Sequence, residues 1–420
     1  MAIDQQVLVI GGGISGLTAT LAAAREGVDV RLVSAAETTL HHASGLLDVL
    51  GSLPESDEPV VDPFAAMEDL PAEHPYSIVG ESAVRSGLAM IDDALGGAYC
   101  GGHTDRNALV VTYGGECKPT ARYPASVAPG LASDDRATLF VGFERETAFD
   151  AETVAASVTR SCAFDARAAT VAFPVVVRDD PTARRFAHLL DRNERVEGRS
   201  IRAALADAIA PHVGDAERIG LPAVLGIDEA AAVRATLEDR LDATVFEVPM
   251  GPPSVLGRRL ERRLYAAVEA AGARVETGRP VVDFDATRGS IDRVSVDRSG
   301  QRIPYAADEV VLATGGVAGG GITDDGRLCE SIFDCHVAQP DDPTWAAADP
   351  FGDHAFARAG VTVDDRLRPL DRSGTPEYDT LRAAGSVLGG FDPAAELSGS
   401  GVSIATGYAA GTAAAREVLA

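Results

Sequence analysis

The stretch VLVIGGGISG at residues 7–16 decides the fold of this chain. Its apolar start predicts a short buried strand, and its glycines precede residues 17–25, an alanine-rich segment that favours a helix. Residues 28–33 then predict a second strand. A strand, a glycine loop, a helix and a strand in this order predict the βαβ unit of a doubly wound, Rossmann-like α/β nucleotide-binding domain.

The glycine loop has the G-x-G-x-x-G spacing, and each glycine in it has a different predicted role. Gly11 permits the tight turn, Gly13 lets the backbone approach a pyrophosphate without an intervening Cβ, and Gly16 allows the helix to pack closely on the strand. The helix N terminus, which includes Ser15, presents unpaired N–H groups and a partial positive charge to a phosphate. We therefore expect Gly11, Gly13, Ser15 and Gly16 to bind a cofactor phosphate.

The end of the second strand departs from the usual dinucleotide pattern. Most dinucleotide domains have an acidic residue there, which accepts a hydrogen bond from a ribose hydroxyl. This chain has Ser34, and Glu37 is a substitute acid by position. A mononucleotide flavin, or a dinucleotide bound in a modified way, fits this departure, with Ser34 as a candidate cofactor contact.

Two further turns are rich in glycine. Residues 309–316 (EVVLATGG) predict a buried strand that ends at Thr314 and Gly315, in a pattern typical of the second signature of many flavoproteins. The other turn contains Gly385 and Ser386, where many flavoproteins have Asp after the glycine. All four residues are candidate cofactor contacts.

The last segment predicts an alanine-rich helix that caps the flavin. The sequence SGSGV at residues 398–402 precedes this helix. Backbone N–H groups of Gly401 and Val402 at the helix N terminus are predicted to stabilise the negative charge that develops at N1 and O2 of a reduced flavin.

Small and polar residues also gather at residues 40–48, LHHASGLLD. This segment resembles the one that flavoproteins of the fumarate reductase type place beside the isoalloxazine ring. Ser44 and Gly45 are therefore the candidates for ring contact. His41 and His42 are candidate catalytic residues, and a surface loop is the alternative explanation for both.

The nucleotide-binding domain is predicted in two parts, residues 1–53 and 251–420, on either side of an insertion at 54–250. The insertion contains most of the prolines and has no nucleotide-loop signature, so we expect an α+β cap or substrate domain there. The predicted helices cover residues 82–95, 203–209 and 254–271, and the predicted strands cover 109–112, 170–177, 274–277, 291–296 and 309–313.

Charge and hydropathy limit the possible partners. The chain has 420 residues, 63 acidic against 37 basic, for a formal net charge of −26, and Lys118 is its only lysine. Free nucleic acid is therefore an unfavourable partner. The same composition is expected of a protein adapted to molar salt, where the Debye length falls to about 3 Å. A bias in genomic base composition, together with a merely acidic surface, is the alternative explanation.

The apolar runs are shorter than the roughly 20 residues of a membrane span, and no targeting signal is visible, so a cytoplasmic location is expected.

The cysteines are few, odd in number and widely spaced, which argues against a disulfide framework. No metal site is predicted, and an iron–sulfur cluster in the electron path is expected on another chain because clusters need several closely spaced thiolates. We expect buried, unligated thiols at all five positions, Cys100, Cys117, Cys162, Cys329 and Cys335.

Two strings are more specific than the glycine loop: PPSVLGRRL at residues 252–260 and GSVLGGFDP at 385–393. With residues 1–48 and HPYS at 74–77, they resemble the B subunit of anaerobic glycerol-3-phosphate dehydrogenase, in the fumarate reductase-like FAD-binding group. The resemblance covers both flavin-domain parts and little of the insertion. Near its end the chain has SGSG at 398–401, where the family has a turn of glycine and cysteine.

The resemblance implies a flavin cofactor, FMN by the family's description, with FAD as the alternative. It also implies two partners: the FAD-containing A subunit of the dehydrogenase, and an iron–sulfur C subunit that anchors the complex to the inner face of the cell membrane and passes electrons to quinone. The chain would then be cytoplasmic and peripheral to the membrane through its partners.

Three functions remain open at this point. The chain can take part directly in oxidising sn-glycerol 3-phosphate to dihydroxyacetone phosphate, with Arg258 and Arg259 as candidate cations for the substrate phosphate. Surface ion pairs explain these arginines equally well. It can instead be an electron-transfer or assembly subunit without a substrate site, which the absence of a persuasive general base favours slightly. A stand-alone flavin dehydrogenase, such as a tRNA-modifying or keto-steroid-type enzyme, is the third possibility.

Overall fold

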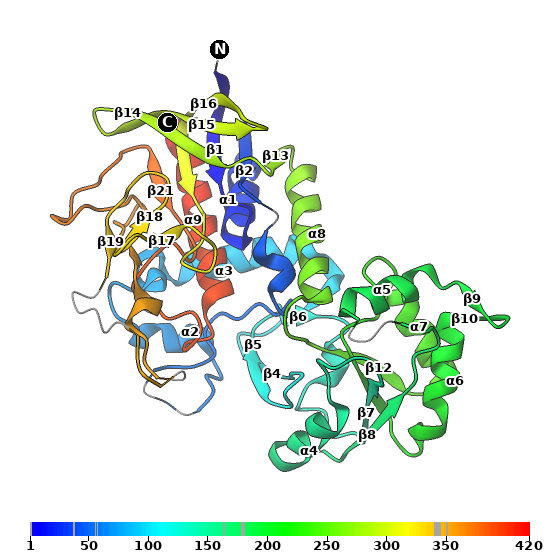
Figure 1. Cartoon of the computed structure of the whole chain (residues 1–420). Coiled ribbons are helices and arrows are strands. Elements are labelled where there is room, and N and C mark those ends of the chain that lie inside the picture. The colour runs from blue at the N-terminus through cyan, green and yellow to red at the C-terminus, as the bar shows by residue number, and fades with distance from the viewer. Residues whose placement is uncertain are drawn as a thin grey trace. The chain divides into compact units, whose positions relative to one another are not determined.

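The computed structural model describes residues 2–36, 38–54, 56, 58–162, 164–177, 181–339, 346–349 and 352–420. The chain forms two compact units (Figure 1). Unit 1 contains Met1–Thr39, Asp48–Ala94 and Arg263–Ala420, and unit 2 contains Leu40–Leu47 and Leu95–Arg262. This division differs from the expected boundaries at 53 and 250, because residues 54–94 pack within unit 1 and residues 251–262 within unit 2. The predicted substitute acid, Glu37, lies outside the described residues.

A parallel sheet forms the centre of unit 1, as the βαβ pattern predicts. Its order is β13-β2-β1-β16, with β21 parallel to β16. The long strand β16 first pairs antiparallel with β15, which pairs with β14, and from Tyr305 onward pairs parallel with β1. The strands of this sheet are β1 (Ile3–Ile10), β2 (Val30–Ser34), β13 (Arg274–Thr277), β14 (Val281–Thr287), β15 (Ser290–Arg298), β16 (Gln301–Leu312) and β21 (Leu381–Ala383).

Two helices of unit 1, α1 (Ile14–Arg25) and α9 (Gly399–Leu419), lie side by side (Figure 1). A Cβ on Gly407 would lie 2.4 Å from the carbonyl oxygen of Ser15, and one on Gly411 would lie 2.2 Å from that of Ala19. Glycine is required at both positions because the helix backbones touch there. The other elements with residues in unit 1 are α2 (Pro63–Ala66), α3 (Pro75–Leu95), α8 (Val255–Ala270), β17 (Ile322–Asp324), β18 (Leu328–Glu330), β19 (Val337–Ala338), β20 (Gly360–Val361), and the 3-10 helices η2 (Met67–Asp69) and η5 (Ala355–Arg358).

The larger sheet of unit 2 is also parallel, in the order β12-β11-β7-β8. Helices connect these strands, and short antiparallel pairs lie in the same unit, so the insertion combines helices and strands as expected. Parallel strands require crossover connections, and helices form them here. Of these helices the sequence had predicted only one, at residues 203–209. The elements are β7 (Thr138–Phe143), α4 (Ala151–Ser161), β8 (Ala166–Val171), α5 (Ala183–Arg192), α6 (Ile201–Val213), β11 (Arg218–Pro222), α7 (Ala230–Leu241) and β12 (Thr244–Val248).

Short antiparallel pairs accompany this sheet: β3 with β6, β4 with β5, and β9 with β10. The predicted strand at 170–177 was wrong beyond Val171, because Pro174 cannot donate to a ladder and Val176 is 92% exposed. The remaining elements are η1 (Thr39–His42), η3 (Gly96–Ala98), β3 (Tyr99–Cys100), β4 (Ala108–Val111), β5 (Cys117–Thr120), β6 (Tyr123–Pro124), η4 (Ala128–Gly130), β9 (Arg195–Val196) and β10 (Arg199–Ser200).

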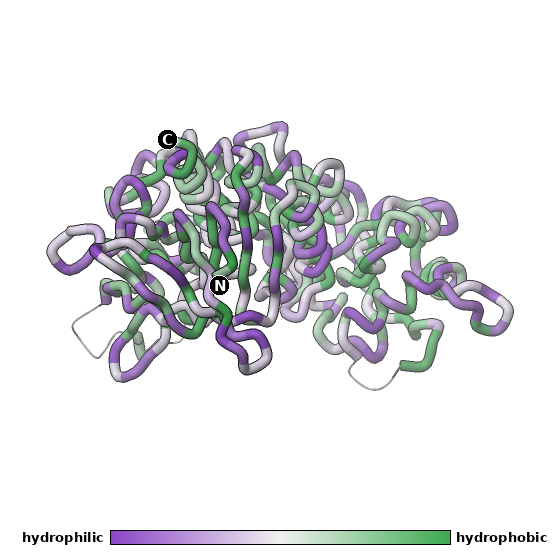
Figure 2. Tube along the Cα trace, turned by 90° about the horizontal axis from the view of Figure 1, so that it is seen from above, coloured by the Kyte–Doolittle hydropathy of each residue, from purple (hydrophilic) through white to green (hydrophobic). Residues whose placement is uncertain are grey.

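Each unit has its own apolar core. In unit 1, Val7, Leu8 and Val9 of β1 are fully buried, and in unit 2 the same holds for Phe140 of β7 and Leu221 of β11. Figure 2 shows hydrophobic stretches alternating with hydrophilic ones along the chain, with many of the outer loops hydrophilic. The apolar runs read from the sequence are therefore strands that are covered on both faces.

Candidate functional site

The loop between β1 and α1 has the tight geometry that its glycines predict. Gly11 adopts a φ of +121°, and its N–H donates to the carbonyl of Val33 at 2.8 Å. A Cβ on Gly11 would lie 2.0 Å from the carbonyl oxygen of Ala313, and one on Gly16 would lie 2.0 Å from that of Gly11. Both positions therefore exclude a side chain on structural grounds alone.

Gly13 is different, because the space around it is open. A Cβ on Gly13 would meet no heavy atom within 4 Å. The backbone N–H groups from Gly12 to Gly16 have no acceptor among the described residues, and they stand at the start of the 12-residue helix α1. Unpaired donors and the positive end of a helix next to free space fit a phosphate group. The loop thus satisfies the requirements for the pyrophosphate or phosphate of a flavin.

Two other glycine-rich turns meet this loop. A Cβ on Gly11 would lie 3.0 Å from the N of Thr314, and one on Gly385 would lie 2.4 Å from the Oγ of Ser15. A Cβ on Gly316 would lie 2.6 Å from the carbonyl oxygen of Ser386. Turns that follow β1, β16 and β21 therefore come together at the carboxyl ends of adjacent parallel strands, where doubly wound sheets bind ligands.

The hydroxyl groups of two residues in these turns differ in whether they already have a hydrogen-bond partner. The Oγ1 of Thr314 is buried and has no hydrogen-bond partner among the described residues. The Oγ of Ser15 donates to the carbonyl of Ala384 at 3.4 Å, and the N–H of Gly385 donates to the Oγ1 of Thr406 at 2.9 Å. The hydroxyl of Ser15 is therefore engaged within the chain, and Gly385 ties its turn to α9.

Ser34 is buried at the end of β2, and its hydrogen bonds are local. Its Oγ donates to the carbonyl of Ala36 at 2.8 Å, and its own carbonyl accepts from the N–H of Arg279 at 2.7 Å. A Cβ on Gly12 would lie 2.9 Å from this Oγ and 2.8 Å from the hydroxyl of Tyr265. The sequence reasoning missed Gly12 and Tyr265, because the G-x-G-x-x-G pattern treats position 12 as variable.

The N terminus of α9 requires a correction. The N–H of Gly401 donates to the carbonyl of Asp48 at 2.7 Å, and the N–H of Val402 donates to that of Ser398 at 2.9 Å. These two groups are therefore not free to stabilise a reduced flavin, because the helix begins at Gly399 and their acceptors are in place. The N–H groups of Gly399 and Ser400 have no acceptor among the described residues, so the available donors lie two positions earlier.

A buried polar network supports this helix end. His74 is 1% exposed, and its Nδ1 accepts from the N–H of Tyr76 at 3.0 Å. The ring proton is therefore on Nε2, which donates to the carboxylate of Glu396 at 3.1 Å. The same carboxylate accepts from the Oγ of Ser398 at 2.9 Å. The HPYS motif at 74–77 is thus part of the structure that holds the start of α9.

Tyr76 completes the network as a neutral donor. Its hydroxyl donates to the carbonyl of Val49. Burial, and then the charges of Glu396 and Asp48, raise the pKa of Tyr76 well above its usual value of 10.0. A Cβ on Gly401 would lie 2.1 Å from this hydroxyl, so the first turn of α9 packs directly against it.

In unit 2, the segment Leu40–Leu47 contains the predicted ring-contact residues. Gly45 has a φ of +80°, and its carbonyl accepts from the hydroxyl of Tyr99 at 2.7 Å. The Oγ of Ser44 accepts from the N–H of Leu46 at 3.3 Å. A Cβ on Gly257 would lie 2.3 Å from the carbonyl oxygens of both Leu40 and Ala43. The PPSVLG string therefore fits closely against this segment.

The two histidines of the segment have different surroundings. The Nδ1 of His41 is buried and has no hydrogen-bond partner in the part of the chain that the structure describes, whereas His42 is exposed. Their ring centroids are 4.1 Å apart. Of the two described rings, His41 is therefore the one with an unpaired buried nitrogen.

Arg259 was wrong as a candidate for the substrate phosphate. Its guanidinium donates to both carboxylate oxygens of Glu247, at 2.6 and 2.9 Å, and to the carbonyl of Gly226 at 2.7 Å. Because Glu247 is completely buried, it requires this counter-ion. Arg258 lies 3.9 Å from Glu261 and is not free either. Both side chains have structural partners.

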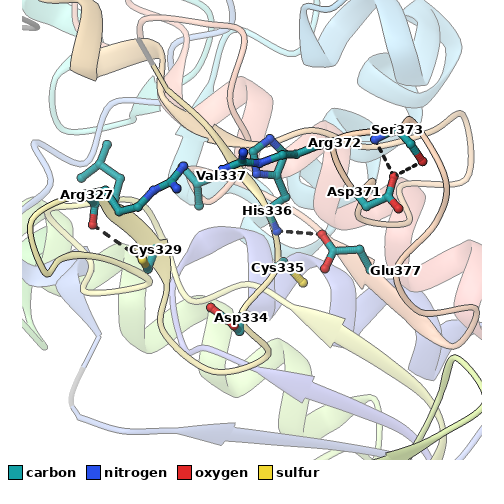
Figure 3. Close-up of a pocket in the computed structure, with 11 residues that line it drawn as sticks. Arg327, Cys329, Asp334, Cys335, His336, Val337, Asp371, Arg372, Ser373 and Glu377 are labelled. Carbon is teal, nitrogen blue, oxygen red and sulfur yellow. Dashed lines mark hydrogen bonds between the residues drawn. The ribbon is translucent and has the colours of Figure 1, made fainter. Parts of the chain in front are cut away.

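Unit 1 also has a pocket of about 490 Å³, shown in Figure 3. Arg327, His336 and Arg372 line it together with Asp371 and Glu377. The two carboxylates already accept backbone hydrogen bonds. Asp371 accepts from the N–H of Ser373 at 2.8 Å, and Glu377 accepts from the N–H of His336 at 2.7 Å. None of the residues predicted to bind the cofactor lines this pocket.

Within the described residues, no helix has both the length and the apolar character needed to cross a membrane.

Comparison with known proteins identifies the family. The FAD binding domain family matches residues 6–402. The chain is 55% identical over its whole length to the probable anaerobic glycerol-3-phosphate dehydrogenase B subunit of Halobacterium salinarum and covers 99% of that protein. It is 30% identical to the anaerobic glycerol-3-phosphate dehydrogenase B subunit of Yersinia enterocolitica, over 95% of each. Among solved structures it is similar to an open form of a flavocytochrome c3 fumarate reductase, with 12% identity and a TM-score of 0.46, over all of this chain and 79% of that one. The chain therefore belongs to the FAD binding domain family and to the family of anaerobic glycerol-3-phosphate dehydrogenase B subunits.

Proposed function

We propose that this chain is a flavin-dependent component of an anaerobic glycerol-3-phosphate dehydrogenase and takes part in oxidising sn-glycerol 3-phosphate to dihydroxyacetone phosphate. The observation that carries this proposal is the row of unpaired N–H groups from Gly12 to Gly16, next to open space at Gly13. Such a row binds phosphate. When bound, a flavin supplies the hydride acceptor for the alcohol carbon of the substrate.

We propose FAD as the cofactor, in place of the FMN that the resemblance implied. The match to an FAD binding domain over residues 6–402 supports FAD. The N–H groups of residues 12–16 would hold the pyrophosphate, with Thr314 and Gly315 on the neighbouring turn. The N–H groups of Gly399 and Ser400 would face the developing negative charge of the reduced ring. Chromatography and mass spectrometry of the extracted cofactor test this assignment, and FMN alone would contradict it.

Ser44, Gly45 and His41 are the proposed ring-side residues. His41 is the remaining catalytic candidate because its Nδ1 is buried and unpaired, so it would accept the proton of the substrate hydroxyl. His41→Asn is expected to lower kcat by about 10²-fold or more. His42→Asn is the matched control with near-normal rates. A near-normal kcat in His41→Asn would contradict the proposed role.

We propose that electrons leave through two partner chains: the FAD-containing A subunit, and an iron–sulfur C subunit that holds the complex at the inner face of the cell membrane and reduces a quinone. The relatives are named as B subunits, which supports an enzyme of several chains. Co-purification of the chain with its partners from native membranes tests this, and a chain that stays alone in the cytoplasmic fraction would contradict it.

Adaptation to high salt is a further part of the proposal. The net charge of −26 supports it, as does the similarity to a Halobacterium protein. Screening of the acidic surface by salt reduces its self-repulsion. Unfolding measured against KCl concentration is expected to show stability rising steeply with salt, and full stability at low salt would contradict this expectation.

An electron-transfer or assembly role without a substrate site is the second candidate. One observation favours it: the predicted phosphate cations, Arg258 and Arg259, both have structural partners. The purified chain, loaded with flavin, is mixed anaerobically with glycerol 3-phosphate while flavin absorbance is followed. Bleaching by the chain alone supports direct oxidation, and bleaching only after addition of the FAD-containing partner supports the relay. A flavin-free chain that does not take up flavin would contradict both.

A further inference from the structure

Two cysteines of unit 2 lie unusually close together. The Sγ atoms of Cys117 and Cys162 are 3.0 Å apart, although 45 positions separate them in the sequence. The sulfur atoms of a disulfide are about 2.05 Å apart. The two sulfurs therefore need to approach by only about 1 Å to reach bonding distance. No other pair of described cysteines has a sulfur–sulfur contact.

The local fold holds both sulfurs in place. Cys117 starts β5, whose hairpin partner is β4, and the turn between them packs on α4: a Cβ on Gly115 would lie 2.5 Å from the Cβ of Ser157. Cys162 directly follows α4, and its N–H donates to the carbonyl of Val158 at 2.7 Å. The two thiols thus sit where a hairpin and the end of a helix are already in contact.

The surroundings of the two thiols differ. Burial raises the pKa of Cys117 to about 12, and the hydrogen bond with Cys162 and the charge of that residue act in the same direction. The Sγ of Cys162 lies 3.9 Å from the Oγ of the exposed Ser161. We place the first attack on Cys162, next to this exposed residue, where its thiolate is the attacking form.

We propose that Cys117 and Cys162 form a reversible disulfide, which makes this pair a redox modification site of unit 2. The oxidant is a low-molecular-weight disulfide. The Cys162 thiolate attacks it, forms a mixed disulfide and releases one small thiol. Cys117 then loses its proton and attacks the Cys162 sulfur, which forms the internal bond and releases the second small thiol. The protein loses two electrons and two protons, and the oxidant gains them.

The bond would act on the segment that contains Ser44 and Gly45. After β5 the chain reaches Arg122, whose backbone exchanges hydrogen bonds with that of Leu47 at 2.8 and 3.0 Å. Leu47 is the last residue of the segment Leu40–Leu47. A covalent link from the end of α4 to β5 therefore restrains the chain shortly before Arg122, the residue with which Leu47 pairs. Slower amide hydrogen exchange at residues 44–47 is expected in the oxidised protein.

Peptide mapping of the full-length protein tests the proposal. The folded chain is incubated with oxidised glutathione, alkylated, digested without reduction and analysed by mass spectrometry. Free thiols are expected to fall from five to three, with one linked peptide pair that contains Cys117 and Cys162, and dithiothreitol is expected to restore all five. Five free thiols after oxidation, or links through Cys100, Cys329 or Cys335, would overturn the proposal.

Single substitutions test the order of attack. Cys117→Ser is expected to stop at a mixed disulfide on Cys162, whereas Cys162→Ser is expected to leave Cys117 free. The matched control Cys100→Ser, at another half-buried thiol of unit 2, is expected to keep the Cys117–Cys162 link. Ring closure in the wild type is expected to accelerate as the pH rises toward the pKa of Cys117. Closure that persists in either pair variant, or a mixed disulfide on Cys117, would contradict the mechanism.

Discussion

The glycine loops of unit 1 and the arginine pair of unit 2 were both predicted to bind ligands, and the structure uses them in opposite ways. In unit 1 the N–H groups of residues 12–16 have no acceptor among the described residues, and the space around Gly13 is open. In unit 2 the guanidinium of Arg259 is engaged by the buried carboxylate of Glu247. A buried charge must be paired, while helix-start donors need no partner inside the chain. Free backbone groups therefore mark the proposed ligand site, and paired charges mark the framework.

The largest expected effect is the loss of flavin binding when the glycine loop of unit 1 is changed. Gly13→Val should abolish flavin retention with little loss of stability, because the new side chain occupies the open space that a phosphate needs and meets no protein atom within 4 Å of its Cβ. The measurements are the flavin-to-protein ratio after gel filtration and the unfolding midpoint of the apoprotein. Retained flavin would show that this loop is not the phosphate site.

The control for this variant is Gly16→Ala, in the same loop. Its Cβ would lie 2.0 Å from the carbonyl oxygen of Gly11, so the backbone must shift. We expect this variant to lose about 1–3 kcal/mol of stability, as overpacked positions do. Equal unfolding midpoints for the two variants would contradict the assignment of Gly13 to ligand binding and of Gly16 to packing.

The next effect is on stability alone. Arg259→Ala should lower the free energy of unfolding by about 3–5 kcal/mol, because it leaves the fully buried Glu247 without its counter-ion. Denaturant unfolding measures this change. Arg262→Ala is the neighbouring control, and its change should stay within about 1 kcal/mol because its ion pair with Asp228 is exposed to solvent. A stable Arg259→Ala variant with a raised KM for glycerol 3-phosphate would restore the substrate role.

A smaller effect is expected in the network that supports α9. Glu396→Gln replaces a carboxylate that accepts from His74, Ser398 and the N–H of Asp392 with an amide that has donors of its own. The loss should be about 1–3 kcal/mol, the range for a buried polar group left unsatisfied. Saturating flavin should still bind, since the residue does not touch the phosphate loop. Unchanged stability would show that this network does not hold the helix end.

The smallest effect depends on pH. Tyr76→Phe should cost about 1 kcal/mol at neutral pH through the lost hydrogen bond to Val49. The pKa of Tyr76 is raised in the folded state, so its contribution is fully present below the ordinary value of 10.0 and is lost as the pH rises through the folded value. The stability curves of wild type and variant should therefore converge above pH 10.0. A constant difference in alkaline solution would contradict the raised pKa.

Local signals predicted the flavin domain well. The strand, glycine loop, helix and strand at the N terminus lie close together in sequence, so periodicity and turn chemistry are sufficient to recognise them. The strand at 274–277 and the helix near 254–271 were found in the same way. The prediction for unit 2 was weaker, because its parallel sheet depends on pairing between strands far apart in the chain. Helix α7 carries only a weak amphipathic pattern, whereas the amphipathic patterns of α4 and α5 were overlooked.

The sequence by itself determined the nucleotide-binding architecture, the geometry of the glycine loop and the family, because these depend on residue types at fixed short spacings. Only the tertiary structure decided which groups remain free. It paired Arg259 with Glu247, tied Gly401 to Asp48, left the N–H groups from Gly12 to Gly16 without an acceptor among the described residues, and brought Cys117 to 3.0 Å from Cys162. The reason is physical: whether a donor, a charge or a thiol is available depends on its neighbours in space, and the folded chain draws those neighbours from distant positions in the sequence.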